Sequence, residues 1–562
     1  MTRKISAVFA ALFLGACTSA TPPLAGPPNP IEIQILAIND FHGNIETPSD
    51  IVSITRADGG VLKARVGGAA QLASALERAR EGQQGTITVA AGDLIGASPL
   101  ASAYFLDEPT IDAMNLIGLN LASVGNHEFD KGSAELLRMQ EGGCSRNTSR
   151  VPCRLEPFGG ARFQYLAANV LRPDGGTIFP ATAVRQVGPI KIGFIGETLK
   201  GTATIVSPAG VAGLRFSDEA ETANALVPIL KAEGADAIVL LIHQGGKVPD
   251  SFEEQGCNGF SGDILPILDK LDPSITIVIS GHTHNAYVCT LERGGATRLL
   301  TSAGRYGYLY SDVRLSFDPS THALVGERAV NVPVIGTSSP DPEVEALVER
   351  YVSAARPEAE RVVGHLDRPA TRELSNGEST VADLIADAQL AATRSPAHGG
   401  ADLSFINTGG VRSNLVPHSD GSVTYGDIFT LEPFGNTLVV RTLSGAQLKA
   451  LLEQQFAEEN GTGKLRSSTL VPSSNFSFAF DRSKPAGSRI VEMRLNGKPI
   501  DPKGRYRVSV NNFLASGGDG YSILEEGSDT FDAGLDLDAL EAWLATSPKV
   551  PGLGRIRDLT SR

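Results

Sequence analysis

The chain has 562 residues, of which 41% are hydrophobic and 20% charged, and its formal net charge is −14. This length exceeds what one hydrophobic core usually holds, so we expect at least two globular domains. The acidic balance argues against a nucleic-acid polymer as a partner, because phosphate backbones attract basic surfaces. An acidic protein can still bind a small phosphate compound where metal ions supply positive charge.

The first thirty residues have the pattern of a bacterial export signal. Arg3 and Lys4 precede an apolar run that is too short to span a bilayer. The following "LGAC" resembles a lipobox, which would make Cys17 the lipidated first residue of the mature protein; an ordinary signal peptide cut near "TSA" is the alternative. We predict a lipoprotein signal peptide over 1–17 and a Pro-rich tether over 18–30. The expected location is the periplasm or the outer-membrane or cell surface, with the lipid anchor as the only membrane contact.

Six short apolar runs in the first half have β-strand character, and each ends in a glycine-containing or polar turn. They are Ile31–Ile38, Thr86–Gly92, Leu119–Gly125, Lys191–Gly196, Ala237–Ile242 and Ile275–Ser280. Helical stretches such as "GGAAQLASALERAREG" and "SDEAETANALVPILKAEG" separate several of them. This alternation predicts a layered α/β domain.

The turns after these runs carry carboxylate, amide and imidazole side chains. These side chains are Asp40, His42, Asp93, Asn126, His127, His243, His282 and His284, which include five of the nine histidines. In open α/β sheets the ligand crevice lies beyond the carboxyl ends of the strands, so residues distant in sequence would meet in one cleft. One such histidine alone is usually a hydrogen-bonded structural residue. Five turns that each carry such side chains after a strand indicate a ligand-binding site instead.

All of these side chains except His127 suit metal coordination. Seven oxygen and imidazole ligands are too many for one tetrahedral ion and predict a pair of ions, of a kind such as Mn, Fe, Co or Zn. His127 adjoins Asn126 too closely for both to bind easily, and Asp130 lies three residues further on. A positioned imidazolium can stabilise charge and protonate a leaving oxygen, so we interpret His127 with Asp130 as a catalytic pair.

Four cysteines remain after Cys17, and export makes an even number of cysteines indicative of disulfides. Three connectivities exist for them, and we prefer Cys144–Cys153 together with Cys257–Cys289. A tetrahedral zinc site is the weaker alternative, because no CxxC spacing occurs.

The pattern changes after about residue 335, which we take as the end of a first domain that begins at residue 31. Residues 336–361 have helical apolar spacing and predict a linking helix. Residues 362–562 form a second block with its own strands, "ADLSFI", "TLVVRTL", "NFSFAF" and "RYRVSV", and none of the histidine-rich turns.

The five turn motifs, D-x-H, G-D, G-N-H-E, a lone His and G-H-x-H, resemble in content and order those of the calcineurin-like metallophosphoesterase superfamily. "NDFHGNIE" with "GNHEFD" is similar more narrowly to the 5'-nucleotidase / UDP-sugar hydrolase family. "INTGGVRSNL", "LEPFGNTL" and "NNFLASGGDGY" look like that family's C-terminal domain. The resemblance implies a four-layer α/β/β/α metallophosphoesterase domain joined by the linking helix to a smaller α/β nucleotide-binding domain.

The resemblance also implies roles for the turn residues. One divalent ion would take Asp40, His42 and His284, and the other would take Asn126, His243 and His282. Asp93 would bridge the two ions, with His127 and Asp130 as the catalytic dyad. The two ions would be Zn, Mn, Co or Mg.

In the second domain, the resemblance implies a nucleoside site. Phe434 and Phe513 would stack on the two faces of the base. Arg372 and Arg412 would hold the phosphate or ribose region. Asn407 and Asp519 would contact base or sugar, and Gly410 would let the backbone approach the ligand. Burial in the core is the alternative for both phenylalanines, but flanking Gly and Asn residues favour surface loops.

The expected activity is hydrolysis of nucleoside 5'-monophosphates, with di- or triphosphates or UDP-sugars as further substrates. A 2',3'-cyclic-nucleotide phosphodiesterase with 3'-nucleotidase activity would use the same turns. A non-catalytic surface protein that binds nucleosides is the alternative from another class. Metal chemistry and base recognition on separate domains would imply a hinge near the linking helix.

Overall fold

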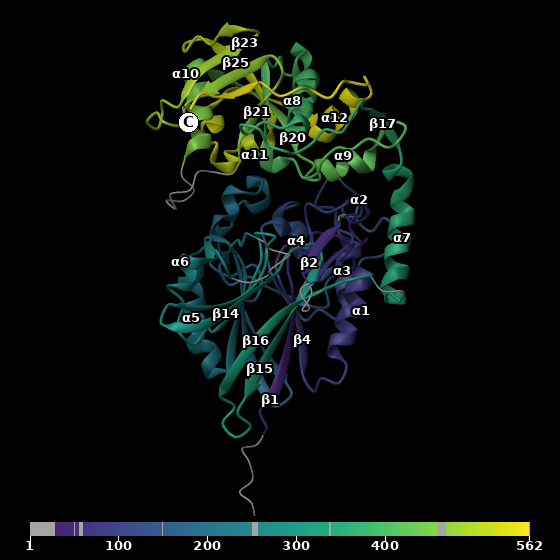
Figure 1. The fold of residues 1–562 in the computed structure, drawn as a ribbon, viewed down its shortest axis with the longest axis vertical. Helices are drawn as coiled ribbons and strands as arrows, with labels where there is room; N and C mark the ends of the chain where they lie inside the picture. The colour runs from purple at the N-terminus through teal and green to yellow at the C-terminus, as the bar shows by residue number, and fades with distance from the viewer. Residues whose placement is uncertain are drawn as a thin grey trace, which may run out of the picture.

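Two six-stranded mixed sheets form the centre of the first domain in the computed structural model, which describes residues 29–49, 51–55, 60–148, 150–249, 257–336, 339–457 and 468–560 (Figure 1). The first sheet has the order β16-β15-β1-β4-β5-β6, formed by Leu324–Pro333, Leu309–Phe317, Ile31–Ile38, Thr86–Ala91, Leu121–Ser123 and Gln164–Leu166. The second has the order β13-β14-β12-β11-β9-β8, formed by Ala286–Arg293, Ala296–Ala303, Ile277–Ser280, Ala237–His243, Ile190–Thr198 and Thr182–Val187. The expected signal peptide, Cys17 and most of the tether lie outside the described residues.

The sheets pack face to face because both faces of their central strands are apolar. In β1, Ile35 and Ala37 enter the core between the sheets, while Leu36 and Ile38 face a helical layer. This alternation is the two-residue period of a strand whose two faces are both covered. Burial of each aliphatic side chain contributes about 1.5–3 kcal/mol to stability, so the packing of the layers is stabilised by many small contributions.

Helices cover the outer face of each sheet and complete the four layers. The first sheet is covered by α1 (Ala69–Arg80), α3 (Glu108–Ile117) and α7 (Pro342–Ala359). The second is covered by α5 (Glu219–Ala232) and α6 (Ile264–Leu268). The expected α/β/β/α arrangement is therefore confirmed. Within the described ranges, no helix combines the length and apolar character needed to cross a bilayer.

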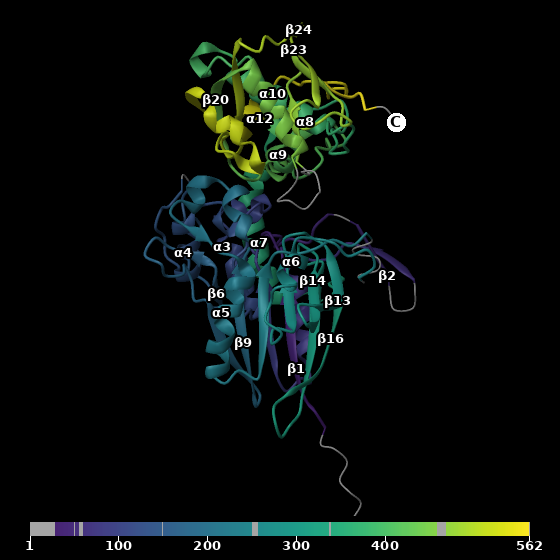
Figure 2. The ribbon, with the colours of Figure 1, turned by 90° about the vertical axis from the view of Figure 1, so that its left-hand side faces the viewer.

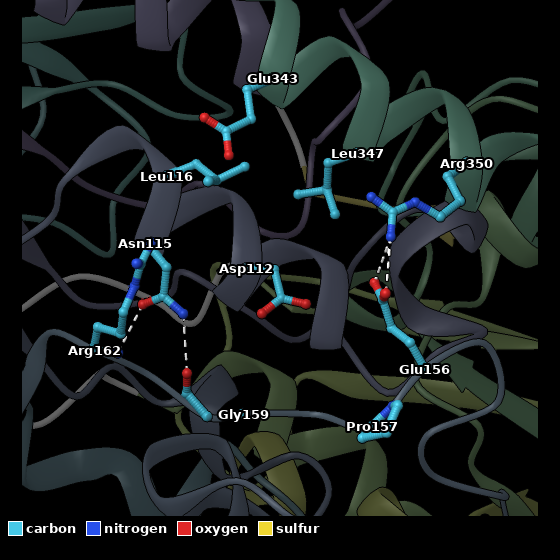
Figure 3. A pocket seen from close by; sticks show the side chains of 11 residues that line it. Asp112, Asn115, Leu116, Glu156, Pro157, Gly159, Arg162, Glu343, Leu347 and Arg350 are labelled. Atoms are coloured by element: carbon cyan, nitrogen blue, oxygen red, sulfur yellow. Dashed lines mark hydrogen bonds and ion pairs between the residues drawn. The ribbon is translucent and has the colours of Figure 1, made fainter.

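Helix α7 links the two domains and runs along the side of the first one (Figures 1 and 2). It begins at Pro342 because the Asp341 side chain accepts hydrogen bonds from the backbone N–H groups of Glu343 and Val344. Its apolar side packs on α1 and α3, and between α7 and α3 lies a cavity of about 460 Å³ around the Asp112 carboxylate (Figure 3).

The second domain is smaller and contains a five-stranded and a four-stranded sheet. The five-stranded sheet has the order β21-β18-β25-β20-β26, formed by Leu470–Pro472, Leu403–Asn407, Arg505–Asn511, Thr437–Ser444 and Ser528–Leu535. The other has the order β24-β23-β22-β27, formed by Lys498–Pro499, Ile490–Leu495, Phe476–Phe480 and Ile556–Asp558. Its main helices are α8 (Thr380–Thr393), α9 (Tyr425–Leu431), α10 (Gly445–Glu453) and α12 (Asp536–Leu544).

The domains touch where α9 meets the linking helix and α2 (Leu100–Ala103) of the first domain. Leu100 and Ala103 enter the same apolar cluster as residues of the second domain. Arg150 of the first domain also lies over the Phe429 ring, 5.2 Å from its centre. The second domain therefore sits above the strand ends that carry the histidine-rich turns (Figure 1).

Two disulfides join the four cysteines of the first domain in the preferred pairing. Cys144 bonds to Cys153, and Cys257 bonds to Cys289. The connectivity prediction is confirmed, and the zinc alternative for these cysteines is wrong.

Candidate active site

The ligand-bearing turns lie together because their strands are neighbours in the two sheets. In the first sheet, β1, β4 and β5 are parallel, so the turns with Asp40, Asp93 and Asn126 leave the same edge. In the second sheet, β11 and β12 are parallel and deliver His243 and the turn that contains His282. Packing of one sheet on the other brings the two sets of turns face to face.

The backbone of these turns is strained. Five of the predicted ligands have a positive φ: Asp40, His42, Asp93, His282 and His284. Such a conformation is uncommon outside glycine and costs roughly 1–3 kcal/mol per residue, so it persists only where the surroundings hold it. Here the His42 N–H donates to the Asp93 carbonyl at 2.9 Å, and the His282 N–H donates to the Asp40 carboxylate at 2.9 Å.

The first ligand group consists of Asp40, His42 and His284. Nε2 of His42 lies 3.0 Å from Nε2 of His284, which in turn lies 3.4 Å from Oδ1 of Asp40. Nδ1 of His42 lies 2.9 Å from the Gly96 carbonyl, so we assign its proton to Nδ1 and leave Nε2 with a free lone pair. Burial lowers the pKa of His42 to about 3, which keeps Nε2 unprotonated at neutral pH.

The second ligand group consists of Asp93, His243 and His282. Nε2 of His243 lies 3.0 Å from Oδ2 of Asp93 and 3.1 Å from Oδ1 of Asn126, and Asn126 also contacts Nδ1 of His282 at 3.0 Å. Burial opposes a charge on His243, but the carboxylates of Asp93 and Asp40 outweigh burial and raise its pKa to about 10. A cation that binds this group must therefore displace a proton.

Asp93 stands between the two groups. Its Oδ2 lies 3.5 Å from Nε2 of His42 and 3.0 Å from Nε2 of His243. Burial alone would raise the pKa of Asp93, but the charges of His243 and His127 hold it well below its ordinary value, so the carboxylate is ionised. Gly125 allows this approach, since a Cβ at that position would overlap Oδ1 of Asp93.

The donor set of the two groups fits two divalent cations. Buried carboxylate oxygens and imidazole nitrogens face one another across about 3 Å, an arrangement of acceptors that a cation stabilises. Each group offers three ligand atoms within 4.8 Å of one another, and Asn126 adds an amide oxygen to the second. These two groups agree with the predicted pair of divalent ions.

His127 and Asp130 form a hydrogen-bonded pair beside the ligand groups. Nδ1 of His127 lies 2.8 Å from Oδ2 of Asp130. Burial disfavours the charged ring, but Asp130 and Asp93 outweigh burial and raise the pKa of His127. The ring packs edge-on against His42 at 5.1 Å between centroids. This imidazole can hold a proton next to the two ligand groups.

Glu128 is a site residue that the sequence did not single out. Its buried carboxylate accepts hydrogen bonds from four backbone N–H groups, those of Gly125, Asp93, Leu94 and Ile95, at 2.6–3.3 Å. It therefore ties the turn that carries Asp93 to the turn that carries Asn126. Its position inside the "GNHE" motif was the available signal, but that motif does not tell which backbone groups a glutamate reaches.

The residues expected to bind a nucleoside lie in the second domain, where Asn407 ends β18. The expected loop position holds for Phe434 and is wrong for Phe513, which lies in the short helix α11 (Asn512–Ala515) and packs against a core cluster. Phe434 stacks on the His127 ring with 5.8 Å between centroids and 15° between planes. Nδ2 of Asn407 donates to the Asp519 carboxylate at 2.8 Å, and a Cβ at Gly410 would lie 2.9 Å from Oδ1 of Asn407. Within the described residues, no ring contact joins Phe434 to Phe513, which is half-buried beside Gly518.

The two expected phosphate-binding arginines are adjacent. Nη1 of Arg372 donates to the Arg412 carbonyl at 3.1 Å, and the Arg412 guanidinium lies 5.6 Å from the centre of the Phe434 ring. The Arg412 guanidinium, the Phe434 ring and the His127 ring therefore stack on one another across the domain boundary. Asn407 and Asp519 form a separate contact deeper in the second domain.

Comparison with known proteins identifies two families along the chain. The calcineurin-like phosphoesterase family matches residues 33–286, and the 5'-nucleotidase C-terminal domain family matches residues 362–526. The crystal structure of a 5'-nucleotidase precursor from Thermus thermophilus is similar, with a TM-score of 0.74 and 26% identity. That alignment covers 94% of this chain and 100% of the other.

Two curated bacterial relatives are longer than this chain. Endonuclease YhcR of Bacillus subtilis is 29% identical over 87% of this chain, which spans 37% of that protein. Cell wall protein Lmo0130 of Listeria monocytogenes is 29% identical over 88% of this chain, which spans 64% of that protein. The chain therefore corresponds to a part of each relative.

Proposed function

The chain belongs to the calcineurin-like phosphoesterases that carry a 5'-nucleotidase C-terminal domain, and from this premise we propose that it hydrolyses nucleoside 5'-monophosphates. The observation that carries the proposal is the stacking of Phe434 on His127 at 5.8 Å. An aromatic surface suited to a base thus faces the metal-binding turns across one cleft. A phosphomonoester with an aromatic base fits that pairing better than a generic phosphate ester does.

In the reaction that we propose, His127 donates the proton that the leaving group needs. Hydrolysis breaks the bond between phosphorus and the 5' oxygen and forms one between phosphorus and a water oxygen. The ions held by the two ligand groups would supply Lewis-acid stabilisation of the phosphoryl charge. The His127 imidazolium, oriented through Nδ1 by Asp130 at 2.8 Å, can protonate the departing 5' oxygen.

The nucleoside half of the proposal rests on the second domain. Arg372 and Arg412 would neutralise the phosphate or contact the ribose, since charge-assisted hydrogen bonds are the strong ones. Asn407 and Asp519 already pair with each other, so together they present one donor and acceptor surface to a base or sugar. Phe434 and Phe513 would close on the base only when a ligand lies between them, which agrees with a hinge at α7.

A panel of substrates tests this proposal. Initial rates would be measured with AMP, 3'-AMP, 2',3'-cyclic AMP and UDP-glucose, each with Mn²⁺, Zn²⁺, Co²⁺ or Mg²⁺ and with an EDTA-treated control. We expect the highest kcat/KM with AMP. A preference for 2',3'-cyclic AMP and 3'-AMP would instead make the protein a cyclic phosphodiesterase with 3'-nucleotidase activity. Nucleoside binding without turnover in any metal would make it a binding protein.

We also propose that the protein is exported and anchored by a lipid on Cys17. The support is the "LGAC" sequence after a short apolar segment, together with a relative named as a cell wall protein. In cells, Cys17→Ser should move the protein from the membrane fraction to the soluble periplasm or medium, because lipid chains supply the membrane affinity. Unchanged membrane association of this variant would contradict the anchor.

A further inference from the structure

The cavity between α3 and the linking helix is lined by residues that take no part in the proposed hydrolysis (Figure 3). Its volume is about 460 Å³, a size typical of cavities that hold small molecules. Asp112, Asn115 and Leu116 of α3 form one wall, and Glu343 and Leu347 of α7 contribute to another. A loop between residues 156 and 162 supplies the rest of the lining, so three segments distant in sequence enclose one space.

The walls of this cavity are fixed by contacts between the segments that form it. Nη1 of Arg350 on α7 donates to both carboxylate oxygens of Glu156 at 2.8 Å. Nδ2 of Asn115 donates to the Gly160 carbonyl at 2.9 Å, and Oδ1 of Asn115 accepts from the Arg162 N–H at 2.7 Å. These contacts join α7 and α3 to the same loop. The cavity is therefore formed before a ligand arrives, as most small-molecule sites are.

The Asp112 carboxylate lies in the middle of the cavity without a hydrogen-bond partner (Figure 3). Among the residues that the structure describes, no donor forms a hydrogen bond or an ion pair with it. Burial, followed by the charges of Glu156 and Glu108, raises the pKa of Asp112 to about 6, against the opposing effect of Arg350 and Arg162. The carboxylate is thus ionised at neutral pH in surroundings that stabilise its charge poorly.

The other charges of the lining leave Asp112 uncompensated. Glu156 and Arg350 pair with each other, so they neutralise one another. Glu343 and Arg162 are both exposed, where water and salt screen their charges. An anionic ligand would therefore meet an unpaired carboxylate in the cavity, whereas a cationic ligand would offset its charge.

The lining favours an organic cation over a metal ion. Within the described part of the chain, three ligand atoms of His, Cys, Asp or Glu come within 4.8 Å of one another only in the two ligand groups of the active site. Leu116, Pro157 and Leu347 give this cavity apolar surface instead. A hydrated metal ion gains nothing from such surface, but the apolar body of an organic molecule would be removed from water there.

We propose that this cavity is a binding site for an organic amine, whose ammonium group pairs with the Asp112 carboxylate and whose apolar body packs on Leu116 and Leu347. The ammonium supplies the charge-assisted hydrogen bond that Asp112 lacks. Because the ligand would contact α3 and the linking helix together, its binding would stabilise the packing of α7 on the first domain. The proposal is independent of the nucleotidase function, since it uses none of the same residues.

The test uses two compounds that differ in one group. At pH 7.5 the compound 2-phenylethylamine carries an ammonium group, whereas 2-phenylethanol has nearly the same shape and is neutral. Calorimetric titration of the whole protein would measure the affinity for each. We expect saturable binding of the amine, and binding of the alcohol that is weaker by about tenfold or more, because a hydrogen bond between charged groups is stronger than a neutral one.

Asp112→Asn keeps the shape of the side chain and removes its charge. Its affinity for the amine should fall by about 10–150-fold, the range for a lost hydrogen bond to a charged group. Its affinity for the alcohol should change little, and Asp174→Asn on an exposed loop should keep the wild-type affinities. The wild-type affinity for the amine should also fall as the pH is lowered through about 6, because protonation neutralises Asp112.

Four results would overturn the proposal. Absence of saturable binding would exclude an amine site, and equal affinities for amine and alcohol would show that the charge is not recognised. Unchanged affinity in Asp112→Asn would place the amine elsewhere, and displacement of the amine by Ca²⁺ would make this a metal site. Cooperative unfolding of Asp112→Asn excludes misfolding as the cause of lost binding. Each result can occur with or without turnover of AMP, so failure of the nucleotidase proposal would leave this one unaffected.

Discussion

The turns that carry the two ligand groups and the residues proposed to bind a nucleoside differ in how firmly the fold fixes them. Asp40, Asp93 and His243 are at most 1% exposed, and their positions are fixed by hydrogen bonds between turns. By contrast, Phe434 lies on a loop and Phe513 in helix α11 of the other domain; both are half-buried, and within the described residues no ring contact joins them. The fold therefore fixes the two ligand groups within one domain, whereas no ring contact fixes the two phenylalanines relative to each other.

This difference has a consequence for substitutions. A change in the metal-binding turns should reduce hydrolysis of every substrate by a similar factor, because all substrates present the same phosphoryl group. The effect of a change at the residues proposed to bind the nucleoside should depend on which substrate is used.

The largest effect is expected for Asp93→Ala. Its carboxylate lies within 3.5 Å of histidines from both ligand groups, so its loss should weaken binding of both ions and reduce turnover to background on every substrate. Metal content by mass spectrometry should fall below two ions per chain, while Asp174→Ala on an exposed loop should keep wild-type values. Two retained ions with wild-type rates in the Asp93 variant would remove its bridging role.

His127→Ala should lower kcat by about 10²–10⁴-fold while both ions stay bound, because we propose that the imidazole is an acid–base group and it lies outside both ligand groups. Asp130→Asn should cost less, since Asp130 only orients the ring. Rates and metal content would be measured together, with His398→Ala as an exposed histidine control. If His127→Ala released an ion, His127 would be a ligand and the dyad assignment would be wrong.

Glu128→Gln should weaken metal binding by about 10–100-fold, the usual effect of removing a residue that orients ligands. The amide replaces one oxygen acceptor by an NH₂ group, which cannot accept from the N–H groups of Gly125 and Asp93. Metal titrations at fixed pH would measure the change, with exposed Glu141→Gln as the control. Full activity at saturating metal would support a positioning role; wild-type metal affinity would contradict it.

Phe434→Ala and Phe513→Ala should each reduce kcat/KM for AMP by roughly 5–30-fold, which corresponds to about 1–2 kcal/mol of base stacking. Turnover of p-nitrophenyl phosphate, which has no base, should change much less. Phe405→Ala serves as a core control, because its buried ring should cost about 3–5 kcal/mol of stability. Equal losses on both substrates together with a similar drop in melting temperature would place the two phenylalanines in the core.

The smallest effect is a gain in stability, expected for Asp112→Asn under the linking helix (Figure 3). Burial, followed by the charges of Glu156 and Glu108, raises the pKa of Asp112 from 3.8 to about 6. The folded state thus binds this proton more tightly, so the contribution to stability is present below pH 3.8 and lost as pH rises through about 6.

Asparagine does not ionise, so Asp112→Asn does not lose stability as the pH rises. It should be about 1 kcal/mol more stable than wild type at pH 7.5, a value reduced for partial exposure to solvent. At pH 4 the gain should disappear. Denaturant unfolding at the two pH values measures both, and Asp174→Asn is the exposed control. A gain of equal size at both pH values would show that charge is not its origin.

The two regions also differed in what the sequence could predict. Each metal ligand follows a short apolar strand within a few residues, so strand ends and ligand type together indicate the site without knowledge of the rest. The run Ile31–Ile38 is a strand over the same residues, and Leu119–Gly125 contains the shorter strand β5 (Leu121–Ser123). The nucleoside-binding residues came only from resemblance, because aromatic and arginine residues on loops have no periodic signal.

Other features depend on packing that sequence patterns do not encode. The antiparallel hairpins β13–β14 and β15–β16 extend both sheets, yet they resemble any pair of alternating strands. Glu128 reaches backbone groups more than thirty residues away, and the cavity at Asp112 exists only because the linking helix packs beside α3. The linking helix was expected over 336–361 and spans Pro342–Ala359, because the Asp341 cap sets its start.

The left-handed backbone at five ligand positions restricts which residue types, and therefore which donor atoms, can occupy them. Asp, Asn and His adopt this conformation far more readily than other residues with side chains. A Cys or Glu would offer a good donor but would cost roughly 1–2 kcal/mol per position in backbone energy. If these five positions were randomised and the variants selected for folding alone, the selection should return residues with oxygen or imidazole donors, or glycine, which has no donor. The backbone conformation of these turns, rather than competition among ions, would then exclude thiolate-rich sites and the soft metals that prefer them.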